Sequence, residues 1–382
     1  MRSFFIEVYI VKQRLSIVLA IITFISTALF AQTPTPTPKP TATPADDGDV
    51  IKVESRLVVV PVSVTDSLGQ PVLGLKANDF RVLEENKRQE IAQVSDAEKV
   101  PLEIALLFDI SASTDSMFQF ELETASQFLK EVMRPDDRAT IFTIGERPIM
   151  VQARSSSETS QISIKNIRST KEFTAFYDSI NAAGNYLGKS APQGTRKVII
   201  AISDGEDTNS EGVRRGFSAV YNSLGRRIDT ISGKELRELL ASKREEIRIK
   251  EQINSLKILQ NADTVFYSIN PAGSSYQLNQ ISMFGQSNLQ KFAEETGGTA
   301  FLPKFAQIDT KDKLQNSFNA RRNQEILSKI FRQLANELQA QYLVQYYSES
   351  DFPMNKYVQL NVNLTAPTNR RVRARQGYFV KN

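Results

Sequence analysis

The chain has 382 residues, enough for two or three domains, and its 41% content of hydrophobic residues is ordinary for a globular protein. Lys and Arg number 47 against 43 Asp and Glu, so the net charge of +4 is small and does not indicate nucleic-acid binding. The sequence contains no Cys and no His. These absences exclude Ser-His-Asp and Cys-His nucleophiles and His or Cys zinc sites, and they leave oxygen atoms as the side-chain ligands for a metal ion.

The first residues predict export. Basic residues precede an apolar run from Leu15 to Phe30, which is typical of a secretory signal over residues 1–31. The alternative is an uncleaved membrane anchor, although the run is shorter than the roughly 20 apolar residues that span a bilayer comfortably. Alternating Thr and Pro then indicate an extended linker at 32–49. We therefore expect a periplasmic, cell-surface or secreted protein that meets a membrane only through this N-terminal segment.

Segments at both ends of the remaining chain alternate apolar and polar residues, as strands with one buried face do. The part at 50–97 predicts a strand and a hairpin around Asn86, and the part at 339–382 predicts three strands. Neither part has enough apolar surface to be stable alone, so we expect the two to pair into one small β-sandwich. The expected strands are Ile51 to Val64, Phe80 to Glu85, Glu90 to Val94, Gln341 to Tyr347, Tyr357 to Leu364 and Val372 to Val380.

Between these parts, over 101–338, strand and helix patterns alternate, which indicates a mostly parallel sheet covered on both faces. We therefore predict an α/β fold, a doubly wound, Rossmann-like domain inserted between the N- and C-terminal strands of the sandwich. The expected strands are Ile104 to Phe108, Ala139 to Ile144, Val198 to Ile202 and Thr264 to Ile269. The expected helices are Phe118 to Met133, Ala175 to Tyr186, Asn288 to Thr296 and Ile326 to Leu338.

One connection in this domain is unusually long. The segment at about 206–261 far exceeds the roughly 2 to 6 residues of a typical loop in α/β units. Its second half, Lys234 to Leu259, is charged and helical in composition, so we expect a helical insertion near the rim of the sheet. Two interpretations stay open, a partner-binding element and a solvated arm without a function.

Oxygen-bearing side chains follow the ends of the expected strands. Asp109, Ser111 and Ser113 come directly after a buried strand, Thr174 precedes a helix, and Asp204 follows another buried strand. Because the carboxyl ends of parallel strands meet at one edge of a sheet, these oxygens can converge there. A set of carboxylate and hydroxyl oxygens suits a hard divalent cation.

In order and spacing, these residues resemble the metal-ion-dependent adhesion site (MIDAS) of von Willebrand factor type A (VWA) domains. The resemblance covers roughly Pro101 to Pro303, interrupted by the long connection. The flanking strands are similar to those of exported bacterial proteins in which this domain is embedded in a sandwich. They end in the stretch Arg373-Ala374-Arg375-Gln376-Gly377-Tyr378-Phe379.

The resemblance implies a role for each residue of the site. Ser111, Ser113 and Thr174 would bind the cation directly through their hydroxyl oxygens, while Asp109 and Asp204 would act mostly through bound water. Neutral ligands leave the cation much of its charge, so an open position would attract an acidic residue of a partner protein. Mg²⁺ suits this geometry, with Mn²⁺ and Ca²⁺ as the alternatives.

Other functions fit part of the pattern. A scaffold protein could bind without metal, through the sandwich or the helical insertion. A Mg²⁺-dependent phosphotransferase would also place Asp109 at a strand end, but such enzymes usually need a second carboxylate where this chain has Ser111. The stretch Gly184 to Ser190 resembles a phosphate-binding P-loop, yet it follows an expected helix where a P-loop follows a strand. We therefore expect a binding protein that is not an enzyme and does not bind nucleic acid.

Overall fold

The structure is a computed structural model. It describes residues 56–95, 99–111, 115–170, 173–271, 280–306, 308, 311–366 and 369–381. The expected signal at 1–31 and linker at 32–49 lie outside these residues, as does Ser113. Within the described ranges, no helix combines the length and the apolar character needed to cross a membrane.

Two four-stranded sheets form a β-sandwich built from both ends of the chain. Its strands are β1 (Arg56–Thr65), β2 (Phe80–Glu84), β3 (Lys87–Gln89), β4 (Ile91–Ser95), β11 (Gln341–Ser348), β12 (Tyr357–Leu364), β13 (Arg371–Ala374) and β14 (Gly377–Phe379). The strand orders are β13-β1-β11-β4 and β14-β12-β2-β3. Both sheets contribute buried side chains to one core, for example Val60 and Val358. The predicted pairing of the two ends is therefore confirmed.

The predicted hairpin is wrong in its second strand. β3 pairs antiparallel with β2, whereas β4 crosses to the other sheet and pairs with β11. Glu85 and Asn86 both have positive φ, 47° and 64°, as a two-residue hairpin turn requires. The returning strand therefore begins at Lys87, and it ends before the segment that the alternation pattern indicated.

The last predicted strand, Val372 to Val380, is also divided. It forms β13 and β14, which belong to different sheets. Between them Arg375 turns inward, and its Nη1 lies 2.8 Å from Oδ1 of Asp263. This ion pair, in which Arg375 is buried and Asp263 is partly exposed, lies where the chain passes from one sheet to the other. Alternation alone could not reveal this change of sheet.

A six-stranded sheet lies at the centre of the α/β domain. Its strands are β5 (Leu102–Asp109), β6 (Arg138–Ile144), β7 (Ile149–Ser155), β8 (Arg196–Ile202), β9 (Thr264–Ile269) and β10 (Ala300–Phe301), in the order β10-β9-β8-β5-β6-β7. The pairings are parallel except that β7 runs antiparallel to β6. A parallel sheet of this kind brings the carboxyl ends of its strands to one edge.

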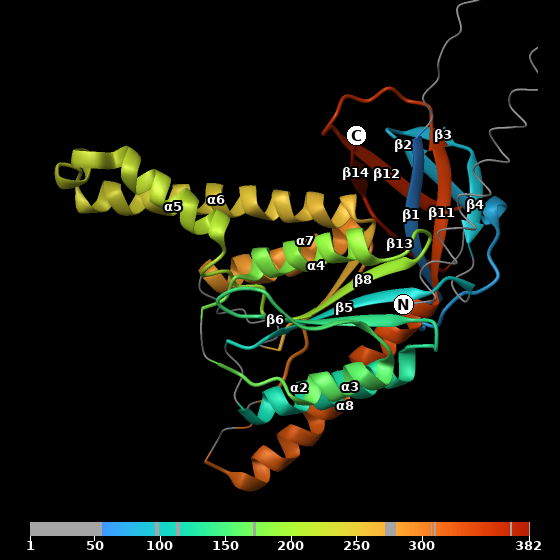
Figure 1. The fold of residues 1–382 in the computed structure, drawn as a ribbon, viewed down its shortest axis with the longest axis horizontal. Helices are drawn as coiled ribbons and strands as arrows, with labels where there is room; N and C mark the ends of the chain where they lie inside the picture. Colours follow the sequence, from blue (N-terminus) through green and yellow to red (C-terminus); the bar gives the residue numbers. More distant parts are fainter. Residues whose placement is uncertain are drawn as a thin grey trace, which may run out of the picture. The chain divides into compact units, whose positions relative to one another are not determined.

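Helices cover both faces of this sheet (Figure 1), as the doubly wound prediction requires. The helices are α2 (Asp115–Val132), α3 (Ser157–Lys165), α4 (Phe176–Ser190), α5 (Glu211–Leu224), α6 (Gly233–Asn261), α7 (Gln280–Thr296) and α8 (Lys313–Gln339), with short 3-10 turns at Ala77–Asp79 and Gly225–Asp229. α2, α3 and α8 pack on one face, and α4, α6 and α7 pack on the other. The P-loop-like stretch lies within α4, so it is helical.

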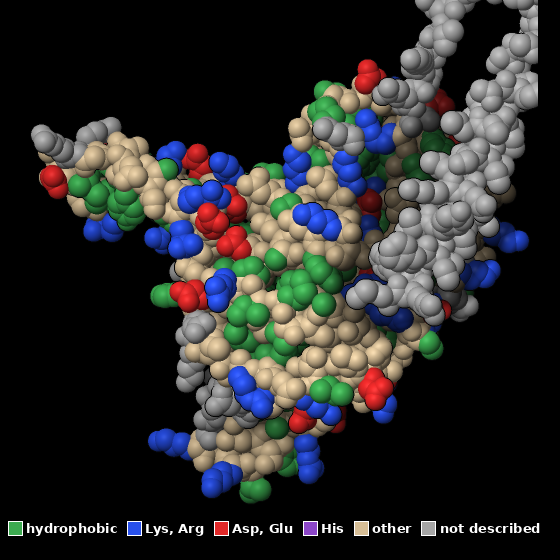
Figure 2. All heavy atoms as spheres, viewed as in Figure 1, with side chains coloured by type: hydrophobic (Ala, Val, Ile, Leu, Met, Phe, Trp, Pro, Cys, Tyr) green, Lys and Arg blue, Asp and Glu red, His purple; other side chains and the backbone are tan. Residues whose placement is uncertain are grey.

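The long connection folds as α5 and α6, which extend together beyond the sheet as a two-helix arm (Figure 1). Figure 2 shows acidic and basic side chains gathered over the base of this arm. The helix expected at Lys234 to Leu259 lies within α6. The last turns of α6 are not part of the projecting arm, because Leu256 and Leu259 are buried in the same core as side chains of α4 and α7.

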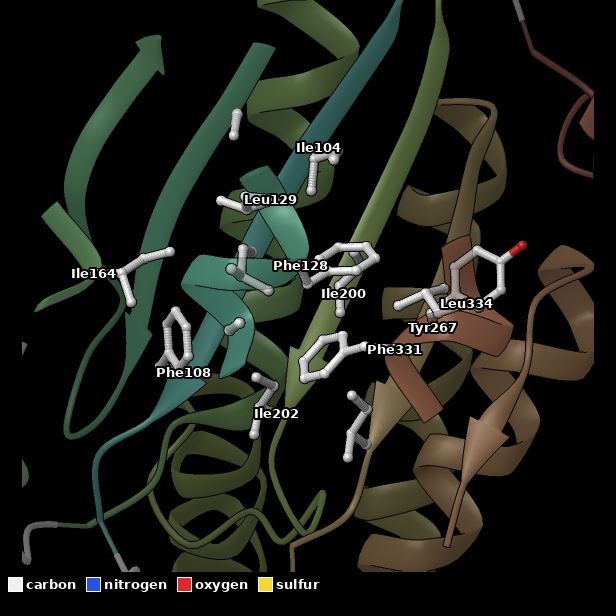
Figure 3. Packing of buried hydrophobic residues seen from close by; sticks show 14 of the residues in the cluster. Ile104, Phe108, Phe128, Leu129, Ile164, Ile200, Ile202, Tyr267, Phe331 and Leu334 are labelled. Carbon is white, nitrogen blue, oxygen red and sulfur yellow. The ribbon is translucent and has the colours of Figure 1, made fainter. Parts of the chain in front are cut away.

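The central strand β5 is buried on both faces, which explains the continuous apolar run from Ile104 to Phe108 within it. Ile104 and Phe108 join the core beneath α2, while Leu107 joins the core on the opposite face. Figure 3 shows the first of these cores, in which the rings of Phe128 and Phe331 have centroids 4.9 Å apart. This packing fixes the end of β5, where the candidate site begins.

Candidate metal site

Asp109 is the last residue of β5 and anchors the site. It is 9% exposed, and both of its carboxylate oxygens accept hydrogen bonds. Oδ1 accepts from the backbone N–H of Ser111 at 3.0 Å and from its hydroxyl at 2.6 Å. Oδ2 accepts from the hydroxyl of Ser203 at 2.7 Å. The carboxylate is therefore held between the loop after β5 and the loop after β8.

Thr174 brings a third loop to the same place. Its hydroxyl donates to Oγ of Ser111 at 2.9 Å, although the two residues are 63 positions apart. Thr208 fixes the backbone of Thr174. The hydroxyl of Thr208 accepts the backbone N–H of Thr174 at 2.9 Å, and the backbone N–H of Thr208 donates to the carbonyl oxygen of Thr174 at 2.9 Å. Thr174, Ser111, Asp109 and Ser203 thus form one continuous chain of hydrogen bonds.

Asp204 lies at the turn after β8. Its Oδ1 accepts the backbone N–H of Glu206 at 2.9 Å, which closes the turn. Gly205 has a φ of 76°, and a Cβ there would lie 2.3 Å from the carbonyl oxygen of Gly285 in α7. The position therefore requires glycine, because only a residue without a side chain allows this close approach. This contact explains the glycine of the Asp-Gly pair.

The two acidic groups of the site, Asp109 and Asp204, both have raised pKa values. Burial raises the pKa of Asp109, and hydrogen bonds from Ser111 and Ser203 offset part of this effect. Burial, followed by the charge of Asp109, raises the pKa of Asp204 to about 7. A cation at the site would favour the ionised form of both carboxylates.

Two residues near the site were not predicted from the sequence. Ser203 contributes the hydroxyl that completes the contacts of Asp109. Glu121 of α2 is 2% exposed, and burial followed by the charge of Asp109 raises its pKa to about 8. Its position on the apolar side of a helix, next to Leu122, is the sequence signal that could have drawn attention to it.

The donor set fits a hard divalent cation. In the described ranges, no three acidic side chains are grouped as a metal-binding set. The site offers instead the hydroxyls of Ser111 and Thr174 beside the carboxylate of Asp109. The charge of Asp109 also acts on the carboxylate of Asp204. Oxygen ligands of this mixed kind suit Mg²⁺, Mn²⁺ or Ca²⁺. The fifth predicted ligand, Ser113, lies outside the described residues.

No protein-family model matches the chain, and no curated protein matches its sequence. Similar solved structures include the conserved hypothetical protein BatB from Bacteroides thetaiotaomicron, with 15% identity and a TM-score of 0.35 over 60% of this chain and 99% of that one. A second is proximal thread matrix protein 1 from the mussel byssus with a zinc-occupied MIDAS motif, with 14% identity and a TM-score of 0.37 over 66% and 48%.

A third similar structure is the SpRpn10 VWA domain, with 11% identity and a TM-score of 0.35 over 53% of this chain and 87% of that one. At identities and TM-scores this low, the alignments carry no argument about shared function. The fold class rests on the strand order and on the helices that cover both faces of the sheet. The chain is a doubly wound α/β domain joined to a β-sandwich.

Proposed function

We propose that this chain is an exported binding protein of the VWA kind, without enzymatic activity. It recognises a partner protein through a divalent cation, for which Mg²⁺ is the first candidate. The observation that supports this proposal most strongly is the hydrogen bond of 2.9 Å between Thr174 and Ser111 beside the carboxylate of Asp109. It unites oxygens from separate loops at the carboxyl edge of the sheet.

When bound, the cation would supply an open coordination position for a carboxylate of the partner. Ser111 and Thr174 present neutral hydroxyl oxygens, which leave the charge of the cation largely unneutralised. Both carboxylate oxygens of Asp109 accept hydrogen bonds from hydroxyl groups, which favours a positioning role for Asp109 over nucleophilic attack. Phe173, 65% exposed beside Thr174, offers apolar contact surface for a partner at the rim.

Affinity capture with and without a chelator tests this proposal. Immobilised wild-type protein in Mg²⁺ is expected to retain partner proteins that EDTA releases, because the cation forms the bridge to the partner. Asp109→Ala should lose the same proteins, and Asp136→Ala, the matched change at an exposed aspartate, should keep them. Mass spectrometry of the eluates identifies the retained set. Capture that persists in EDTA would contradict the proposal and support a metal-independent scaffold.

A further inference from the structure

A cavity of about 470 Å³ lies at the edge of the central sheet opposite the candidate metal site. It opens between the sandwich and the end of α6, close to Asp263, which directly precedes β9. Figure 2 shows Lys and Arg side chains gathered where β12 and β14 approach α6. The cation-dependent function proposed above makes no use of this region.

The charged groups that line the cavity are unbalanced. Arg56, Arg375 and Lys381 line it together with a single acid, Asp263. The carboxylate of Asp263 already forms ion pairs with two of these three basic side chains. Its Oδ1 lies 2.8 Å from Nη1 of Arg375, and its Oδ2 lies 3.5 Å from Nζ of Lys381. The cavity therefore carries an excess of positive charge.

Two guanidinium groups of the cavity lining retain donors that nothing in the described part of the chain accepts. Nη1 of Arg56 and Nε of Arg375 are buried and have no hydrogen-bond partner there. Buried donors of this kind are unfavourable and call for an explanation, such as an acceptor that is brought by a ligand. The planar fork of an Arg side chain matches the oxygens of a carboxylate or a phosphate.

Arg375 is held firmly in place. It is 5% exposed, and its guanidinium carbon lies 5.5 Å from the centroid of the Tyr378 ring. Its Nη1 also donates to the carbonyl oxygen of Gln260 at 3.5 Å, in addition to the ion pair with Asp263. Arg375 and Tyr378 both belong to the C-terminal stretch singled out in the sequence, for which the metal site gives no reason.

We infer that this cavity binds a small organic oxyanion, whose carboxylate or phosphate group is held by Arg56 and Arg375. Lys381 adds charge at the cavity, and Asp263 keeps Arg375 in position. Leu57 and Met354, which are 47% and 51% exposed, also line the cavity and contact the apolar part of the ligand. The inference is independent of the metal site, because the two lie at opposite edges of the sheet.

Calorimetric titration of the full chain in metal-free buffer tests the inference, with inorganic phosphate and hexanoate as the two probes. The ionic strength is held constant with chloride. At least one probe is expected to show saturable binding, and Arg56→Gln should weaken that binding by about tenfold or more, because it removes the charged donor. Arg81→Gln, at an exposed arginine of β2, is the matched control and should bind as the wild type does.

Arg375→Lys provides a second variant, since it keeps the charge and removes the planar fork. Thermal unfolding first shows that this variant is folded, and its affinity is expected to fall as well. Binding of phosphate alone would assign a phosphoryl ligand, and binding of hexanoate alone would assign a carboxylate with an apolar chain. The inference is overturned if neither probe saturates or if Arg56→Gln binds with the affinity of the wild type.

Discussion

Glu121→Gln is expected to raise the free energy of unfolding of the metal-free protein by on the order of 3 kcal/mol at about pH 9. Glu121 is 2% exposed, and its Oε1 has no hydrogen-bond partner among the described residues. Burial and then the charge of Asp109 raise its pKa to about 8. A neutral amide of the same shape removes the cost of placing a charge there.

The pH dependence of this effect has a definite sign. The pKa of Glu121 is higher in the folded protein than the value of 4.5 for the free side chain, so the folded state binds the proton more tightly. Its contribution to stability is therefore present below pH 4.5 and is lost as the pH rises through about 8. Denaturant unfolding at about pH 5 and about pH 9 should show the variant gaining only at the higher pH.

Glu123→Gln is the matched control for this experiment, because Glu123 is an exposed acid on the same helix. It should leave the free energy of unfolding unchanged at both pH values. If Glu121→Gln instead changed stability equally at low and high pH, the buried charge would not be the cause. Added Mg²⁺ should narrow the gap between wild type and Glu121→Gln, since a nearby cation favours the ionised carboxylate.

Glu84→Ala is expected to lower the free energy of unfolding by about 3 to 5 kcal/mol. Glu84 lies on β2, is 1% exposed, and accepts three hydroxyl hydrogen bonds. The donors are Tyr346 at 2.8 Å, Ser348 at 2.8 Å and Tyr378 at 2.7 Å. Because Tyr346 and Ser348 belong to β11 in the other sheet, the substitution would leave buried hydroxyls without partners across the sandwich.

Chemical denaturation measures this effect, and Glu90→Ala is the control at an exposed glutamate between β3 and β4. The control should change the free energy of unfolding by less than about 0.5 kcal/mol. Tyr378→Phe removes one of the three donors and should cost about 1 to 2 kcal/mol. A loss for Glu84→Ala no larger than that of the control would show that the carboxylate does not hold the sheets together.

Strands with one buried face could be predicted well from the sequence. β12 was expected at the bounds that the structure has, because Val358, Leu360 and Val362 are buried and alternate with exposed residues. β7 was not predicted, since Ile149 and Met150 follow one another and both are exposed. Its position is set by pairing with β6, which is information that the segment itself does not contain.

The residues of the candidate site that lie at the ends of strands and helices could be predicted from the sequence. Asp109 ends a strand that can be recognised by its continuous apolar run, and Ser111 follows it. Thr174 precedes a helix of clear periodicity. Ser203 could not be assigned in this way, because its direction toward Asp109 depends on how the loop turns after β8. Glu121 escaped notice because an acid within a helical pattern is normally exposed to solvent.

Calorimetric titration of Mg²⁺ and of Mn²⁺ into the metal-free protein tests the cation site most directly. We expect saturable binding of one ion per chain, which Asp109→Ala abolishes and Thr174→Val weakens by about tenfold or more. Asp136→Ala, at an exposed aspartate, should bind as the wild type does. Equal affinity of the wild type and Asp109→Ala for both ions would contradict a cation site at the end of β5.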